Sequence, residues 1–159
     1  KIPAIDSARI GIMGFSLGGG VTLRTAVEKN RALWMGADKG FASHVAFYPA
    51  GKGFITEFGN GNNPMTGAPM IIFYGTEDSY GDGSAVPALK RLLLEKYQFE
   101  VTTVEYAGVH HGFNRNGPPL NYTDPASSGG KGYIAWDAKA ANDSLTQVVD
   151  FLRKTLLAK

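Results

Sequence analysis

Short apolar runs alternate along this chain with segments of helical period. The runs at Arg9–Met13, His44–Tyr48 and Met70–Tyr74 are mainly apolar at successive positions, which is typical of strands buried on both faces of a parallel sheet. A fourth run, Glu100–Tyr106, alternates polar and apolar residues, which suits an edge strand. The pattern predicts an α/β fold with about four mainly parallel strands flanked by helices. We expect the first run to form a central strand.

Three segments have apolar residues at helical spacing. These residues are Leu23, Ala26 and Val27 in the first segment, Leu89, Leu92, Leu93 and Tyr97 in the second, and Leu145, Val148, Val149, Leu152 and Leu156 in the third. The first helix should end near Asn30, and Ser84 can cap the second. We expect residues 51–68 to form a loop with one short helical turn, and residues 107–133 to be irregular.

The composition limits the classes of partner. The chain has 159 residues, of which 43% are hydrophobic, and we expect a single domain over residues 1–159. No apolar stretch approaches the roughly 18 residues of a membrane span, so we expect no membrane partner. The 16 basic and 14 acidic side chains are scattered, which argues against nucleic acid and favours a small-molecule ligand. The absence of cysteine excludes disulfides and thiolate metal sites and fits a reducing or an oxidising compartment, of which we favour the cytoplasm.

The strongest local motif is Gly14-Phe15-Ser16-Leu17-Gly18, a G-x-S-x-G pattern between the first strand and the following helix. In that setting a sharp, strained turn projects the serine hydroxyl above the sheet, and the flanking glycines let backbone and helix come close. The Leu17 N–H, at the N-terminus of the helix, is placed to stabilise an oxyanion. The motif therefore predicts that Ser16 is a nucleophile. The alternatives are a phosphate-binding turn and a plain tight connection.

A serine nucleophile needs a base, and the base needs a carboxylate to orient it. Asp78 follows the third strand and His111 follows the fourth, which gives the order Ser, Asp, His of α/β-hydrolases. Because the carboxyl ends of parallel strands meet at one edge of a sheet, we expect the three side chains to converge there. Glu77 and Asp82 are alternative carboxylates in the same loop.

The other two histidines are weaker candidates for the base. His110 adjoins His111, so the two cannot both point into one site. His44 begins the second strand, so we expect it at the end of the sheet opposite the carboxyl ends of the strands, where its role would be structural. No metal-ligand spacing is recognisable, so we predict no metal site.

Further short motifs follow one another along the chain. They are the run from Arg9 through Gly20, the strand end Phe47-Tyr48, the segment Tyr74-Gly75-Thr76-Glu77-Asp78, the tripeptide His111-Gly112-Phe113, and the tail with Tyr133, Asp137-Ala138 and the run from Val149 to Leu152. Together they resemble the dienelactone hydrolase family of α/β-hydrolases over essentially the whole chain. The resemblance implies that Ser16 is the nucleophile, Asp78 the acid member and His111 the base. Dienelactone hydrolase itself has a cysteine nucleophile, so Ser16 points toward the carboxylesterase-like relatives.

The resemblance has two further implications. The run His111-Gly112-Phe113-Asn114-Arg115 matches the family's H-x-F-x-R, in which the arginine grips a substrate carboxylate; the alternative for Arg115 is a solvated surface role. The chain would be the C-terminal half of the fold, because the nucleophile motif normally lies near the middle. The preceding half would supply a second oxyanion N–H. We therefore expect a longer natural protein, in which that half or a second copy covers the Ile10–Met13 strand.

These observations lead to one functional prediction and two alternatives. The prediction is a hydrolase that attacks the ester or lactone carbonyl of a small molecule through Ser16, His111 and Asp78, without a cofactor. One alternative is a non-catalytic or incomplete fragment that serves as an interaction half for a partner chain. The other is a prolyl-oligopeptidase-like peptidase, which shares the order Ser, Asp, His.

Overall fold

A four-stranded parallel sheet forms the centre of the structure, a computed structural model that describes residues 5–36, 38–81 and 83–157. In spatial order the strands are β1 (Gly11–Phe15), β2 (Ser43–Phe47), β3 (Met70–Gly75) and β4 (Thr102–Tyr106). Every neighbouring pair is parallel, and β2 and β3 are buried along their whole length. The predicted α/β fold is confirmed, and β4 lies at an edge as its alternating pattern indicates.

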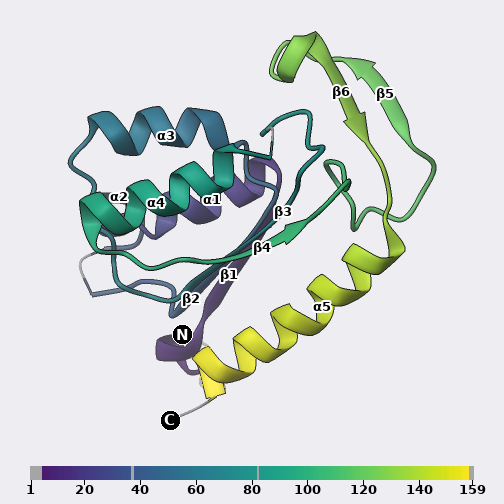
Figure 1. Ribbon diagram of the computed structural model, residues 1–159. Coiled ribbons are helices and arrows are strands. Elements are labelled where there is room, and N and C mark those ends of the chain that lie inside the picture. Colours follow the sequence, from purple (N-terminus) through teal and green to yellow (C-terminus); the bar gives the residue numbers. More distant parts are fainter. Residues whose placement is uncertain (1–4, 37, 82, 158–159) are drawn as a thin grey trace.

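Helices cover both faces of this sheet (Figure 1). They are α1 (Leu17–Thr25), α2 (Glu28–Met35), α3 (Gly51–Asn60), α4 (Ala85–Tyr97) and α5 (Ala138–Leu152). One buried cluster joins α1, α3 and α4 to one face of the sheet, and a second joins α5 to the other face. Short helical turns occur at Ser7–Arg9, Ser128–Gly130 and Arg153–Leu157. Within the described ranges, no helix has both the length and the apolarity that crossing a bilayer requires.

Strand β1 lies at the edge of the sheet rather than in its centre. Within the described residues it pairs only with β2. Its apolar side chains are consequently accessible, with Met13 50% and Phe15 41% exposed. The expectation of a central strand came from apolar character at successive positions. That pattern indicates that both faces of a strand are suited to pack against apolar layers. The place of the strand in the sheet depends instead on which strands pair with its two edges.

The segment after β2 is more helical than the sequence indicates. Helix α3 spans ten residues where a loop with one short turn was expected. Phe54 and Phe58 lie one turn apart on its buried face, and both are almost fully enclosed. At its C-terminal end, Lys96 Nζ donates hydrogen bonds to the carbonyl groups of Phe58, Gly59 and Gly61. Packing and capping by α4 therefore outweigh the low helix propensity of the glycines in this segment.

Two other boundaries differ from expectation. The first helical segment is two helices, because Val27 adopts extended backbone and forms a bridge with Met65. Residues 107–133, expected to be irregular, contain strand β5 (Leu120–Thr123) and most of β6 (Lys131–Ile134), which pair as an antiparallel hairpin. Strand β5 is exposed along its whole length, and its four residues are the shortest run in which alternating apolar and polar residues indicate a strand. Figure 1 shows the hairpin beyond the end of the sheet toward which β4 points.

A buried histidine makes the stability of this fold depend on pH. His44, in β2, is completely buried, and this burial lowers its pKa from 6.5 to about 4, an effect that the carbonyl groups of Thr25 and Pro69 oppose only in part. Between those pKa values the unfolded chain binds a proton that the folded chain does not, so this contribution to stability is complete above pH 6.5 and is lost as the pH falls toward 4. We predict that the free energy of unfolding falls by about 3 kcal/mol from this group across that window.

Urea unfolding at pH 7 and at pH 4.5 measures this effect. The His44→Leu variant removes the titrating ring, so its free energy of unfolding should fall less over the same interval. An equal fall in the wild type and in His44→Leu would contradict the prediction, as would a ring pKa above 6 measured by NMR.

Candidate active site

Ser16 occupies a strained turn between β1 and α1. Its backbone has φ 53° and ψ −116°, a conformation that residues other than glycine rarely adopt. The turn is fixed by a backbone hydrogen bond from the Ser16 N–H to the carbonyl oxygen of Phe47 (3.0 Å), at the end of β2. The serine side chain is therefore directed by the backbone, at the carboxyl end of the sheet.

The two motif glycines contribute unequally to this turn. A Cβ at Gly14 would lie 2.1 Å from the carbonyl oxygen of Gly18 and 2.7 Å from Thr22 Oγ1, so no side chain fits there. At Gly18, by contrast, nothing lies within 4 Å of the Cβ position among the described residues. The expected close approach of backbone and helix therefore explains the glycine at position 14. At position 18 there is room for a side chain, so close approach does not explain that glycine.

This difference gives a matched pair of variants. Gly14→Ala must push the start of α1 away from β1, and we expect it to lower the free energy of unfolding by about 1–3 kcal/mol. Gly18→Ala places a methyl group in open space within a helix, so we expect unchanged or slightly higher stability. Thermal or urea denaturation of the two variants measures the difference. Equal stability of the two would show that α1 can shift without cost.

Ser16, His111 and Asp78 form one continuous chain of hydrogen bonds. His111 Nε2 lies 2.8 Å from Ser16 Oγ, and His111 Nδ1 lies 2.8 Å from Asp78 Oδ2. The other carboxylate oxygen of Asp78 accepts a hydrogen bond from the Tyr80 N–H (2.7 Å). His111 and Asp78 are 3% and 6% exposed, whereas Ser16 is half-buried. A carboxylate can only accept, so it holds the ring proton on Nδ1 and leaves Nε2 free to take a proton from the serine.

Topology brings these distant residues together. Asp78 lies in the turn after β3, and His111 lies in the segment after β4. The two segments are joined by backbone hydrogen bonds, from the Thr76 N–H to Tyr106 O (3.0 Å) and from the Glu77 N–H to Val109 O (3.0 Å). Ser16 follows β1, so all three side chains come from the carboxyl ends of parallel strands, where sites in open α/β sheets lie.

The other acids and histidines lie outside this chain of hydrogen bonds. Glu77 is exposed, and Asp82 lies outside the described residues. His110 packs edge-on against Tyr133, and its Nδ1 lies 3.0 Å from the carbonyl oxygen of Glu77. His44 lies near the start of β2, at the opposite end of the sheet. Within the described part of the chain, no three His, Asp or Glu side chains gather as metal ligands would.

The two predicted substrate contacts have different surroundings. Leu17 is the first residue of α1, where the N–H lacks an intrahelical acceptor, and its side chain is 81% exposed. Arg115 is exposed, and its guanidinium donates to the carbonyl oxygen of Pro118 (3.1 Å) within its own loop. The Leu17 N–H thus adjoins Ser16 directly. The role of Arg115 remains a prediction.

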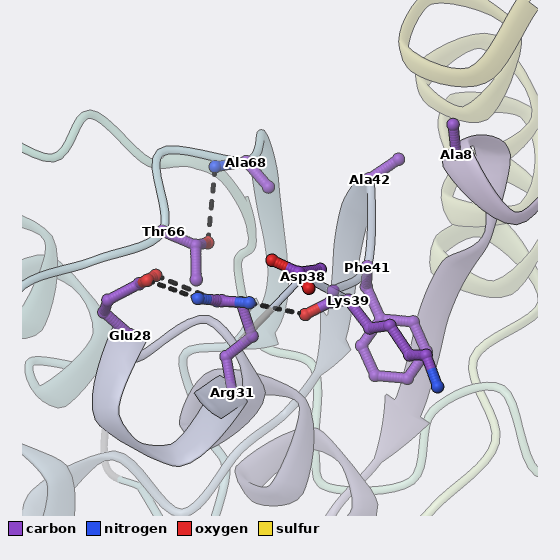
Figure 2. Close-up of a pocket in the computed structure, with 10 residues that line it drawn as sticks. Ala8, Glu28, Arg31, Asp38, Lys39, Phe41, Ala42, Thr66 and Ala68 are labelled. Carbon is purple, nitrogen blue, oxygen red and sulfur yellow. Dashed lines mark hydrogen bonds and ion pairs between the residues drawn. The ribbon is translucent and has the colours of Figure 1, made fainter. Parts of the chain in front are cut away.

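A separate hollow of about 400 Å³ lies at the other end of the sheet (Figure 2). Ala8, Ala42 and Ala68 line it, and each precedes a strand. Its main polar group, Arg31, bonds to the Glu28 carboxylate and to the carbonyl oxygen of Lys39 (2.7 Å). These bonds fasten α2 to the following loop, so the guanidinium serves a structural purpose. The hollow is remote from Ser16.

Two tyrosine rings beside His111 complete the site, and sequence reasoning missed both as site residues. Tyr48 packs edge-on against the imidazole with 4.6 Å between ring centroids, and Tyr80 packs at 4.5 Å. Tyr48 follows β2 and has a positive φ of 37°, and its hydroxyl bonds to Asn114 Oδ1 (2.5 Å). The position of Tyr48 at the end of a predicted strand was an available signal. Nothing in the sequence distinguished Tyr80 from an ordinary loop residue.

Comparison with known protein families identifies the family of this chain. The model of the dienelactone hydrolase family matches residues 1–156. The chain belongs to the dienelactone hydrolase family. The solved structures that the chain resembles are α/β-hydrolases, and this likeness shows that it has the α/β-hydrolase fold. No curated protein matches this family member closely enough in sequence to count as a relative.

Solved structures of α/β-hydrolases share the fold of this dienelactone hydrolase family member. An α/β-hydrolase enzyme from a Medee basin deep-sea metagenome library is 17% identical, with a TM-score of 0.63 over 96% of this chain and 56% of that one. A dienelactone hydrolase-like promiscuous phosphotriesterase from metagenomic libraries is 15% identical, with a TM-score of 0.62 over 97% and 55%. Esterase 2 of Thermogutta terrifontis, phosphorylated by paraoxon, is 19% identical, with a TM-score of 0.64 over 98% and 58%. The chain thus spans a little over half the length of these three structures.

Proposed function

We propose that this protein is a serine esterase that hydrolyses a small ester or lactone through Ser16, His111 and Asp78. The observation that carries the proposal is the unbroken chain of 2.8 Å hydrogen bonds from Ser16 Oγ through the imidazole to Asp78 Oδ2. A serine hydroxyl is a poor nucleophile until a base takes its proton, and this arrangement supplies the base and orients it. Membership in a hydrolase family supports the same reaction class.

In the proposed reaction, Ser16 Oγ attacks the carbonyl carbon while its proton passes to His111 Nε2. The resulting oxyanion is stabilised by the Leu17 N–H at the start of α1, where the helix dipole adds positive potential. His111 then gives the proton to the leaving alkoxide, and an acyl group remains on Ser16. Water, deprotonated by His111, attacks this acyl group; the acid leaves and the proton returns to Ser16. Asp78 stabilises the imidazolium formed in each half of the cycle.

The substrate contact proposed for Arg115 would make carboxylate-bearing esters the preferred substrates. The support is its place in the loop that directly follows His111, with the spacing H-x-F-x-R. Because Arg115 is exposed and its guanidinium donates to a loop carbonyl oxygen, that of Pro118, the guanidinium can turn toward a bound carboxylate.

A covalent probe tests the esterase proposal directly. A fluorophosphonate phosphonylates an activated serine with loss of fluoride, so we expect labelling of the full-length protein, mapped by peptide mass spectrometry to Ser16. Turnover of simple aryl esters should accompany labelling and should exceed turnover of peptide substrates. Absence of labelling at high probe concentration would contradict the proposal and favour a non-catalytic module. Faster cleavage of peptides would favour the peptidase instead.

A further inference from the structure

The ring of Tyr80 is in direct contact with the imidazole of His111. Their centroids lie 4.5 Å apart with an angle of 46° between the planes. Tyr80 lies two residues after Asp78, and its own N–H donates to Asp78 Oδ1 (2.7 Å). One residue therefore contacts both the carboxylate and the ring that this carboxylate orients.

The Tyr80 hydroxyl is held by the β5–β6 hairpin. It lies 2.6 Å from the Tyr122 hydroxyl and 2.8 Å from Asp124 Oδ2. A carboxylate only accepts, so Tyr80 donates to Asp124 and accepts from Tyr122. Burial and the hydrogen bond to the Asp124 carboxylate raise the pKa of Tyr80 well above its usual value, so the phenol keeps its proton at any working pH. The tether therefore has a neutral Tyr80 phenol as the donor to Asp124.

The hairpin is also attached to the backbone around the site. The Ser128 N–H donates to Ser79 O (2.7 Å), and the Tyr133 N–H donates to Ser79 Oγ (3.2 Å). At the end of β6, the Ala135 N–H donates to the carbonyl oxygen of His111 itself (3.2 Å). The same hairpin therefore contacts the turn that carries Asp78 and the residue that carries the imidazole.

We propose that Tyr80 is a positioning residue for His111, and that the β5–β6 hairpin acts on the reaction by holding the Tyr80 ring against the imidazole. This proposal rests on the proposed role of His111 as the base. The ring restricts rotation of the imidazole, which must keep Nε2 directed at Ser16 while Nδ1 stays on Asp78. The face of a phenol also favours a cation, so it favours the imidazolium that forms as Ser16 attacks.

Three variants of the full-length protein separate these contributions. Tyr80→Leu removes the ring and the hydroxyl, whereas Tyr80→Phe keeps the ring and removes only the tether. Tyr74→Phe is the matched control, because it breaks a phenol–carboxylate hydrogen bond of similar length, to Glu105 (2.6 Å), outside the site. For a 4-nitrophenyl ester we expect kcat to fall about tenfold in Tyr80→Leu and about threefold in Tyr80→Phe, with KM within about twofold of the wild type. Tyr74→Phe should keep the wild-type kcat.

A second measurement does not depend on turnover. The proton between His111 Nδ1 and Asp78 Oδ2 should give a downfield NMR resonance that exchanges slowly with water, because the Tyr80 ring covers the imidazole. We expect exchange about tenfold faster in Tyr80→Leu, and unchanged exchange in Tyr74→Phe.

The outcomes separate the two proposals. A folded Tyr80→Leu with wild-type kcat and slow exchange would overturn the positioning role. If Tyr80→Leu does not fold, wild-type kcat and exchange in Tyr80→Phe would overturn it. A third outcome combines two results. If the wild type neither hydrolyses esters nor reacts with the fluorophosphonate, the esterase proposal is refuted. If the His111 Nδ1 proton still exchanges faster in Tyr80→Leu than in the wild type, the positioning of the imidazole by Tyr80 is established all the same.

Discussion

Ser16→Ala is expected to lower kcat for ester hydrolysis by about 10⁴- to 10⁶-fold, because no other group takes the place of the attacking oxygen. Labelling by the fluorophosphonate should disappear in parallel. Stability should change little, because Ser16 is half-buried and, among the described residues, its hydroxyl bonds only to His111. Stopped assays with a high enzyme concentration measure a loss of this size.

Ser7→Ala is a suitable control for this variant. Ser7 is an exposed serine in the turn before β1, so its removal should leave both turnover and labelling at wild-type levels. A Ser16→Ala protein that is folded and retains more than about one-tenth of the wild-type kcat would show that another nucleophile acts.

Asp78→Asn should lower kcat by about 10⁴-fold through a change of tautomer. The amide can keep the hydrogen bond that Asp78 Oδ1 accepts from the Tyr80 N–H, so its NH₂ group faces His111 Nδ1 in place of Oδ2. An amide N–H forces Nδ1 to accept, which moves the ring proton to Nε2. An imidazole protonated at Nε2 cannot receive the proton of Ser16.

Glu77→Gln is the matched control, because it makes the same chemical change one residue earlier on an exposed side chain. We expect wild-type kcat for Glu77→Gln and wild-type KM for both variants, as measured by steady-state kinetics. Equal activity of the two variants would show that the acid member of the relay is not Asp78.

The sheet could be predicted from the sequence because the burial of each strand is reflected in its pattern of apolar and polar residues. β2 and β3 are apolar at successive positions and are buried on both faces, and β4 alternates and lies at an edge. The candidate site could be predicted for the same reason. Once parallel strands are located, their carboxyl ends share an edge, so residues that follow β1, β3 and β4 must lie near one another.

Elements stabilised by distant contacts could not be predicted in this way. Helix α3 depends on burial of Phe54 and Phe58 and on Lys96, which lies in α4, and none of these appears in its local propensity. The β5–β6 hairpin has an exposed strand and is fixed by Tyr80. Tyr80 was missed as a site residue because its contact with His111 joins two loops that are distant in the sequence.

The separation of Ser16 from His111 makes the relay a reporter of complete folding. Their hydrogen bond joins residues 95 positions apart, one at the end of β1 and one beyond β4. A species with the turn at Ser16 formed on β2 but with β3 and β4 unpaired would lack the base, because the native segment that carries His111 is joined to the turn after β3 by backbone hydrogen bonds. If Ser16 reacts as proposed, its covalent labelling during refolding therefore reports the docking of the segment that carries His111, whereas helical circular dichroism reports the formation of the helices.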